Sequence, residues 1–143
     1  MFDNCRNSKK QGDVGLGQAI AYFARTGWTV CIPMTDSQEY DLVVDDGGGL
    51  KRVQVKTTRY VHKQSGRYSV NLRTMGGNQS YHTSKNFDKT RVDLVYIVLE
   101  SGDEFLIPAK DIQSVTTFCV TSSHDKYRVS GRCPAQESVK LPP

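Results

Sequence analysis

Hydrophobic and polar residues alternate most clearly in two short stretches of the chain, residues 40–45 and residues 51–56. Both stretches are rich in β-branched side chains, which favour strands. Residues 46–49, Asp-Gly-Gly-Gly, separate them, and such a run is typical of a turn. The pattern therefore predicts a β-hairpin.

Folding this hairpin about the middle of its glycine run sets the register of the two strands. Asp41 then lies opposite Gln54, and Val43 lies opposite Arg52. Because side chains alternate between the faces of a strand, Asp41, Gln54 and Lys56 share one face. The other face is apolar and suited to a core, and it consists of Leu42, Val44, Val53 and Val55.

A helical pattern precedes the hairpin. Apolar residues recur at helical spacing from Val14 to Ala24, Ser8 and Gln11 fit a capping box, and Gly27 is a natural stop. We expect a helix over residues 9–26 with Ser8 as its N-cap. The glycines at positions 12, 15 and 17 each cost such a helix up to about 1 kcal/mol. They indicate that a sheet or a ligand backbone approaches this face closely.

The remaining pattern predicts further strands and a mixed α/β fold. One helix followed by strands fits a mixed sheet flanked by helices, with the first helix packed on the apolar face of the hairpin. We expect one domain over residues 1–121 and a C-terminal arm or tail over residues 122–143. The predicted strands are a buried first strand at 28–32, a strand at 68–72 and a central second hairpin of 93–99 with 104–108, followed by a short helix at 109–114.

Composition limits the class of protein. The chain has 143 residues, of which 24% are charged and 37% hydrophobic, as in ordinary globular domains. No apolar run is long enough to span a membrane, and the first residues have no apolar signal-peptide core, so we expect a cytoplasmic protein without a membrane partner. The four cysteines lack any CxxC spacing, which argues against a zinc site or a disulfide framework.

Positive charge is concentrated in the middle of the chain. The net charge is only +4, but residues 51–89 contain nine Lys and Arg and two His against one acid, Asp88. Such an asymmetry is the electrostatic footprint expected of a protein that contacts phosphate backbones. A solvated basic surface is the simpler interpretation of charge alone.

The polar side of the hairpin carries a recognisable motif. Asp41 is followed, after twelve intervening residues, by Gln54-x-Lys56. This D…QxK arrangement resembles the PD-(D/E)XK nucleases, and in particular their branch of small bacterial and intron-encoded homing endonucleases, where a QxK variant occurs. The resemblance covers about residues 9–112. It extends to residues 15–19, Gly27-Trp28, YDLVV at 40–44, QVKT at 54–57, VDL at 92–94 and FLIP at 105–108.

The resemblance implies a restriction-endonuclease-like fold and a divalent cofactor, Mg²⁺ or Mn²⁺. It assigns metal binding to Asp41, the amide oxygen of Gln54 and the backbone carbonyl of Val55, and it gives Lys56 the task of positioning or deprotonating the attacking water. A hard cation on oxygen ligands can neutralise a phosphodiester and stabilise the leaving alkoxide. Without the resemblance, an exposed Asp41–Lys56 ion pair worth at most about 1 kcal/mol would be the simpler interpretation.

Gln18 departs from the family pattern. Relatives commonly carry a glutamate on the first helix at the position that aligns with Gln18, which we include among the catalytic candidates. Asp41 is then the only carboxylate of the proposed site, and magnesium binding should be weak unless DNA phosphate completes the coordination shell. Asp13 or Glu39 could compensate, or Gln18 marks a catalytically weakened nuclease.

The resemblance implies a DNA endonuclease, most like a site-specific homing endonuclease, acting on double-stranded DNA. Cutting both strands needs two active sites, so we expect a symmetric homo-oligomer, a dimer or a tetramer. The alternatives are a Holliday-junction or structure-specific resolvase on the same fold, and a DNA-binding protein that does not cleave. The candidate DNA-binding residues are Lys9, Lys10, Thr57, Arg59, Tyr60, Lys63, Arg67, Arg73, Lys85 and Lys89.

Overall fold

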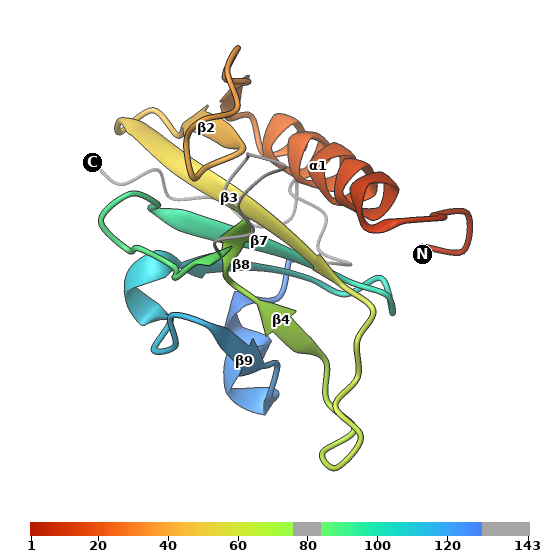
Figure 1. Cartoon of the computed structure of the whole chain (residues 1–143). Coiled ribbons are helices and arrows are strands. Elements are labelled where there is room, and N and C mark those ends of the chain that lie inside the picture. The colour runs from red at the N-terminus through yellow and green to blue at the C-terminus, as the bar shows by residue number, and fades with distance from the viewer. Residues whose placement is uncertain (76–83, 130–143) are drawn as a thin grey trace.

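The computed structural model describes residues 1–75 and 84–129 and contains one long helix and a mixed β-sheet (Figure 1). No helix in these two ranges is long and apolar enough to cross a membrane. The elements follow in the order α1 (Ser8–Arg25), β1 (Thr29–Cys31), β2 (Leu42–Asp45), β3 (Leu50–Thr58), β4 (Ser69–Asn71), β5 (Thr74–Met75), β6 (Ser84–Lys85), β7 (Leu94–Leu99), β8 (Glu104–Pro108), the 3-10 turn η1 (Ala109–Asp111), β9 (Thr117–Cys119) and the 3-10 turn η2 (Ser122–Tyr127).

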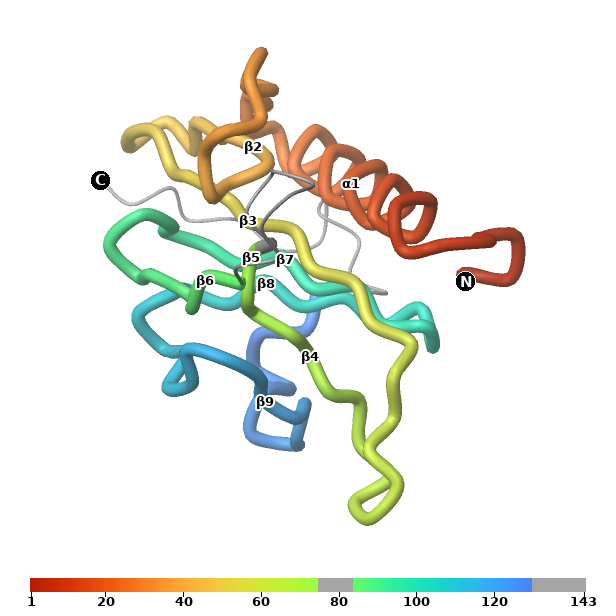
Figure 2. Tube along the Cα trace, in the orientation of Figure 1, coloured from red at the N-terminus to blue at the C-terminus, as the bar shows by residue number. Residues whose placement is uncertain are grey.

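The main sheet has five strands in the order β1-β2-β3-β7-β8, which the trace in Figure 2 follows. β3 and β7 run parallel, and the other neighbours are antiparallel. Two smaller sheets pair β4 with β9 and β5 with β6. This arrangement confirms the predicted mixed sheet. The second hairpin, expected at the centre, contributes the inner strand β7 but its other strand, β8, lies at the edge, and β3 is the middle strand.

α1 covers one face of the main sheet. Its buried stripe, Gly15, Ala19 and Phe23, packs on Leu42 and Val53, the predicted apolar face of the hairpin. The helix begins one residue earlier than predicted because Asn7, not Ser8, is the N-cap, and its Oδ1 accepts a hydrogen bond of 2.9 Å from the Lys10 amide.

The opposite face of the sheet is covered mainly by strands and loops rather than by a second long helix. A second cluster of buried apolar side chains lies on this face. Alternation along β7 directs Val95 and Ile97 into this second cluster, whereas Tyr96 and Val98 face α1. Val70 from β4 and Phe105 from β8 complete the packing. Both faces of β7 are therefore buried, as its apolar sequence suggests.

Two expectations about the outer elements need correction. The first strand is shorter than residues 28–32 and lies at the edge of the sheet, where Thr29 and Cys31 are exposed because β1 has only β2 beside it. The helix expected at 109–114 is the single 3-10 turn η1. Residues 122–129, the beginning of the predicted arm, lie against β8, where the Val129 amide donates to the Glu104 carbonyl. The domain boundary at 121 stays a prediction.

Gly15 explains one of the three helix glycines. A Cβ at this position would overlap the Thr57 Cγ2 methyl and would lie 3.3 Å from Val55 Cγ1 on β3. Gly12 and Gly17 face open space, so the expected close approach is wrong for these two positions. The helix therefore contacts β3 most closely at one residue, directly over the strand that carries the QxK residues.

Gly15→Ala should destabilise the fold by about 1–3 kcal/mol, because overpacking forces α1 away from β3. Gly17→Ala is the matched control and should stabilise by up to about 1 kcal/mol through helix propensity alone. Urea unfolding measures both. Thr57→Ser removes the clashing methyl, so it should restore much of the stability lost in Gly15→Ala. A Gly15→Ala protein as stable as the parent would contradict this account of the packing.

Candidate functional site

Asp41 lies immediately before β2 and is held against β3 by two hydrogen bonds. Its backbone amide donates to the Val53 carbonyl at 2.8 Å, and its Oδ2 accepts from the Val55 amide at 2.7 Å. The observed pairing of Val43 with Arg52 and of Leu42 with Val53 confirms the predicted register and places Asp41 opposite Gln54. The Asp41 carboxylate is therefore held in a fixed position against β3, the second strand of the hairpin.

Gln54 is buried, with 3% of its surface exposed. Its Nε2 donates to the Glu39 carbonyl at 3.0 Å, and this contact fixes the orientation of the amide because only the nitrogen can donate to a carbonyl. Its Oε1 has no hydrogen-bond partner among the described residues. A buried acceptor without a partner is costly, and it marks a place where a cation or a water would be stabilised.

Lys56 follows on the same face of β3 and is half-buried. Its Nζ donates to the Arg73 carbonyl at 3.0 Å, in the segment that links β4 to β5. Thr58, two residues on, donates to the Ser69 carbonyl, so the polar face of β3 is tied to the β4 segment at two points. Lys56 is thereby held beside Asp41 and Gln54 rather than extended into solvent.

The electrostatics of Asp41 and Lys56 are coupled. Desolvation raises the pKa of Asp41, although the Val55 amide and the Lys56 charge oppose this rise. Desolvation also lowers the pKa of Lys56, against the attraction of Asp41. Asp41 keeps an exposed surface, but neighbouring protein atoms displace enough water from its carboxylate for desolvation to dominate. A bound partner of opposite charge would therefore stabilise the ionised form of either group.

The oxygen atoms at this place suit a hard cation. They are the Asp41 carboxylate, the free Oε1 of Gln54 and the Val55 carbonyl, which lies on the same side of β3 as the Val55 amide that binds Asp41. Magnesium and manganese prefer carboxylate and carbonyl oxygens. Within residues 1–75 and 84–129, no three Asp, Glu, His or Cys side chains gather as a metal-binding group, so the donor set depends on the amide and the backbone.

Gln18 lies away from these residues. It is on α1, which packs on the Val53 and Val55 face of β3, opposite to Gln54 and Lys56, and its amide contacts the Met1 sulfur at 4.0 Å. Its catalytic role stays a prediction.

The predicted DNA-binding residues fall into separate regions. Arg73 and Lys85 lie next to the catalytic candidates, whereas the exposed Tyr60, Lys63 and Arg67 belong to the loop after β3, which extends downward in Figure 1. Lys9 and Lys10 are exposed at the start of α1, and Lys89 is half-buried before β7.

Two members of that set have internal partners. The Thr57 hydroxyl accepts from Gln11 Nε2 at 2.9 Å beneath α1. The Arg59 guanidinium donates to Gln11 Oε1 and to the Phe2 carbonyl, both at 2.9 Å, and lies over the Phe2 ring. These contacts anchor the N-terminal segment, so Thr57 and Arg59 already have a structural task.

Residues that the sequence did not single out complete the surroundings. Arg52 binds the Asp93 carboxylate through Nε at 3.0 Å and Nη2 at 3.2 Å, which joins β3 to the start of β7. Arg91 lies 3.9 Å from Glu39, the residue whose carbonyl holds Gln54. A hollow of about 210 Å³ lies here, lined by Ser37, Gln38, Glu39, Tyr40, Arg52, Lys85 and Arg91. Of these lining residues, the sequence had indicated Lys85 as a DNA-binding candidate and Glu39 as a carboxylate that could compensate at the site.

Comparisons with known proteins concern the family and the fold of the chain. The model of the PD-(D/E)XK endonuclease family matches residues 6–130. Protein 5.3 of Escherichia phage T7 is 29% identical over 102 residues, which are 71% of this chain and 80% of that protein. The bacterial homing endonuclease I-Ssp6803I has a similar fold, with a TM-score of 0.67 and 22% identity over 85% of this chain and 88% of that one. The match over residues 6–130 shows that the chain belongs to the PD-(D/E)XK endonuclease family.

Proposed function

We propose that the protein is a Mg²⁺- or Mn²⁺-dependent endonuclease that cleaves double-stranded DNA at specific sites, in the manner of a homing endonuclease. The observation that carries the proposal is the convergence of the Asp41 carboxylate, the unpartnered Oε1 of Gln54 and the Lys56 ammonium on one face of β2 and β3. Family membership and the fold shared with a bacterial homing endonuclease support it.

In this proposal Asp41, Gln54 Oε1 and the Val55 carbonyl hold the cation, which supplies Lewis-acid neutralisation of the scissile phosphate. Lys56 orients the attacking water. Because desolvation lowers the pKa of Lys56, its amine gives up a proton more readily than an exposed lysine and can then accept one from that water. The Arg73 carbonyl fixes the Nζ position from which this transfer occurs.

A DNA-binding protein that does not cleave is the second candidate. It is favoured by the amide at position 54 and by the single carboxylate, Asp41, among the proposed ligands. Such a protein would keep the fold and the basic surfaces but would lack the charge needed to hold a divalent cation. Cleavage assays separate the two candidates directly.

With Mg²⁺, the wild-type protein should nick and linearise supercoiled DNA. Asp41→Ala should lower the cleavage rate at least about 100-fold because it removes the anionic metal ligand. Lys56→Ala should lower it by a similar factor because it removes the group that orients the attacking water. Lys126→Ala, an exposed lysine on η2, is the charge-matched control and should cleave normally. Equal rates for wild type and Lys56→Ala would reject the catalytic assignment. A wild type that binds DNA without cutting supports the second candidate.

Gln54→Glu should be less stable than wild type in EDTA by about 1–3 kcal/mol or more, because a carboxylate cannot donate to the Glu39 carbonyl and would be buried as a charge. Added Mg²⁺ should recover part of this loss if position 54 contacts the cation. Thermal unfolding with and without the metal measures both effects. Recovery of the same size in Gln54→Ala would exclude a ligand role for this side chain.

The chain carries one candidate site, so double-strand cleavage is expected from a symmetric dimer or tetramer. Light scattering should give a mass of two or four chains, alone or with a cognate duplex. Comparison of linear duplex with four-way junction DNA tests the target class, and a strong preference for the junction would favour a resolvase. A monomer on cleaved DNA would contradict the oligomer proposal.

A further inference from the structure

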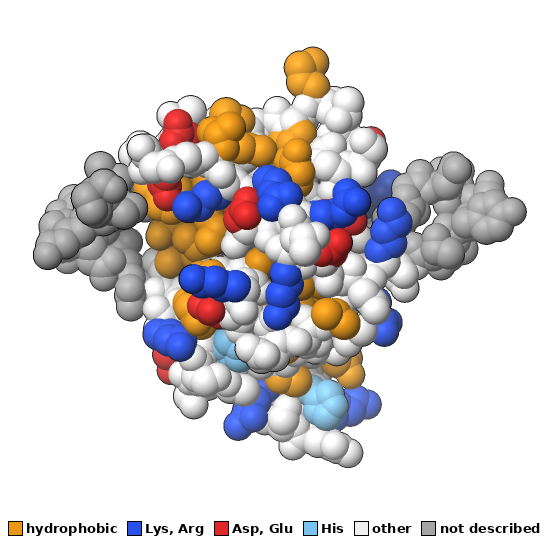
Figure 3. Space-filling model, turned by 90° about the vertical axis from the view of Figure 1, so that its left-hand side faces the viewer, with side chains coloured by type: hydrophobic (Ala, Val, Ile, Leu, Met, Phe, Trp, Pro, Cys, Tyr) orange, Lys and Arg blue, Asp and Glu red, His pale blue; other side chains and the backbone are white. Residues whose placement is uncertain are grey.

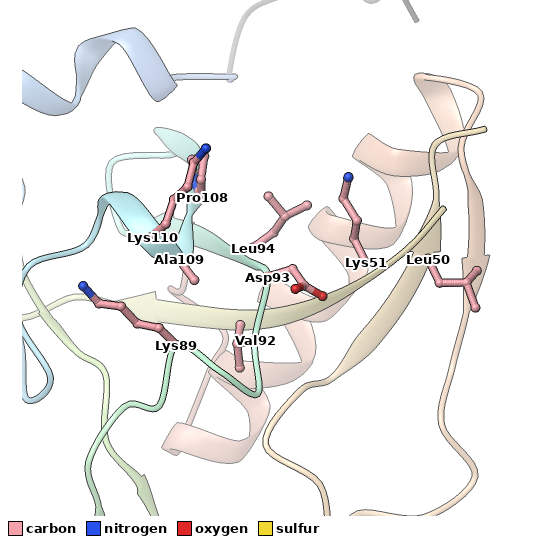
Figure 4. A pocket seen from close by; sticks show the side chains of 9 residues that line it. All are labelled: Leu50, Lys51, Lys89, Val92, Asp93, Leu94, Pro108, Ala109 and Lys110. Carbon is pink, nitrogen blue, oxygen red and sulfur yellow. The ribbon is translucent and has the colours of Figure 1, made fainter. Parts of the chain in front are cut away.

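A second basic hollow lies at the end of the main sheet where β3 and β7 begin and β8 ends. β3 starts at Leu50, but its pairing with β7 starts only at Val53, so the two strands leave space between their first residues. The resulting groove measures about 660 Å³. Figure 4 shows its lining, which consists of Leu50, Lys51, Lys89, Val92, Asp93, Leu94, Pro108, Ala109 and Lys110.

The charge of this groove is positive. Lys51, Lys89 and Lys110 reach it from β3, from the loop before β7 and from η1 (Figure 4). Asp93 is the only acid in its lining, and the Arg52 guanidinium already neutralises that carboxylate. Lys51 has an ion pair with Asp46 at 3.3 Å, whereas Lys89 and Lys110 have none among the described residues.

The groove also offers apolar surface. Leu50 is 70% exposed and Leu94 and Pro108 are half-buried, whereas Val92 and Ala109 line the groove but are buried. A ligand that fits such a lining combines regularly spaced negative charges with less polar groups between them. The sugar-phosphate backbone of DNA has this character, because deoxyribose separates successive phosphates.

The position of the groove relates it to the proposed catalytic residues. Lys51 and Gln54 are three residues apart on β3, which corresponds to about 10 Å along a strand. Because side chains alternate along a strand, Lys51 shares the face of Val53 and points away from the face that carries Gln54 and Lys56, so the groove lies beside the proposed catalytic face. Figure 3 shows Lys and Arg side chains across the middle of this end of the molecule, with Asp and Glu side chains between them.

We propose that this lysine groove binds the DNA backbone outside the segment that contacts the proposed catalytic face. The inference rests on the proposed function. It adds Lys51 and Lys110 to the candidate DNA-binding residues, which already include Lys89. The contact is to phosphates and sugars, so it contributes affinity and register without sequence preference.

The test measures binding of a fluorescent duplex in EDTA, where no cleavage occurs, as a function of salt. Each lost phosphate contact lowers the slope of log affinity against log salt by about 0.9, so Lys89→Ala/Lys110→Ala should lower the slope by about 1.8 and weaken binding at low salt at least about 10-fold. Lys126→Ala controls for net charge and should leave the slope unchanged. Unfolding midpoints should stay close to wild type because Lys110 is exposed and Lys89, although half-buried, has no ion pair among the described residues.

The outcomes separate the groove from the proposed function. An unchanged slope in the double variant, or an equal loss in Lys126→Ala, overturns the groove assignment, while cleavage by wild type and its loss in Lys56→Ala leave the nuclease intact. A slope lowered in the double variant supports the groove even if no cleavage is found. A wild-type protein that binds no duplex at low salt rejects both proposals.

Discussion

The pairing of β2 with β3 is the constraint on which the rest of the structure depends. If β3 slipped by one residue against β2, Val53 would turn away from α1 and from Leu42, and Gln54 and Lys56 would turn toward α1. The hydrogen bond from the Val55 amide to the Asp41 carboxylate extends this pairing beyond the last residues of the ladder. The same bond therefore fixes the register and positions a proposed metal ligand.

The contacts of Gln54 explain why an amide is favourable at this position, where the family motif has an acid. Its nitrogen holds the Glu39 carbonyl, so it steadies the segment that leads into Asp41, and its oxygen stays free as an acceptor. A carboxylate could supply the acceptor but not the donor. The amide makes the proposed site less negative than a carboxylate would. It also holds the segment before Asp41 in place, so that Asp41 can bind β3.

The sequence predicted the parts of the structure that depend on local periodicity and failed where contacts are long-range. Alternation and the glycine run were sufficient for the hairpin, its register and the shared face of Asp41, Gln54 and Lys56, because these follow from strand geometry. The use of Arg59 to anchor Phe2 could not be predicted, since 57 residues separate the two. The lysine groove could not be predicted either, because its three lysines come from separate elements that only the fold brings together.

A site with one carboxylate makes the proposed metal and DNA dependent on each other. A divalent cation held by Asp41, an amide oxygen and a backbone carbonyl would keep a net positive charge, so phosphate oxygens of DNA would stabilise it further. Linkage requires that the metal strengthen DNA binding by the same factor. In the proposed arrangement the lysines of the groove bind DNA without the metal, so they contribute affinity that a site with one carboxylate does not supply. The loss of acidic ligands is then offset by basic residues elsewhere on β3 and its neighbours.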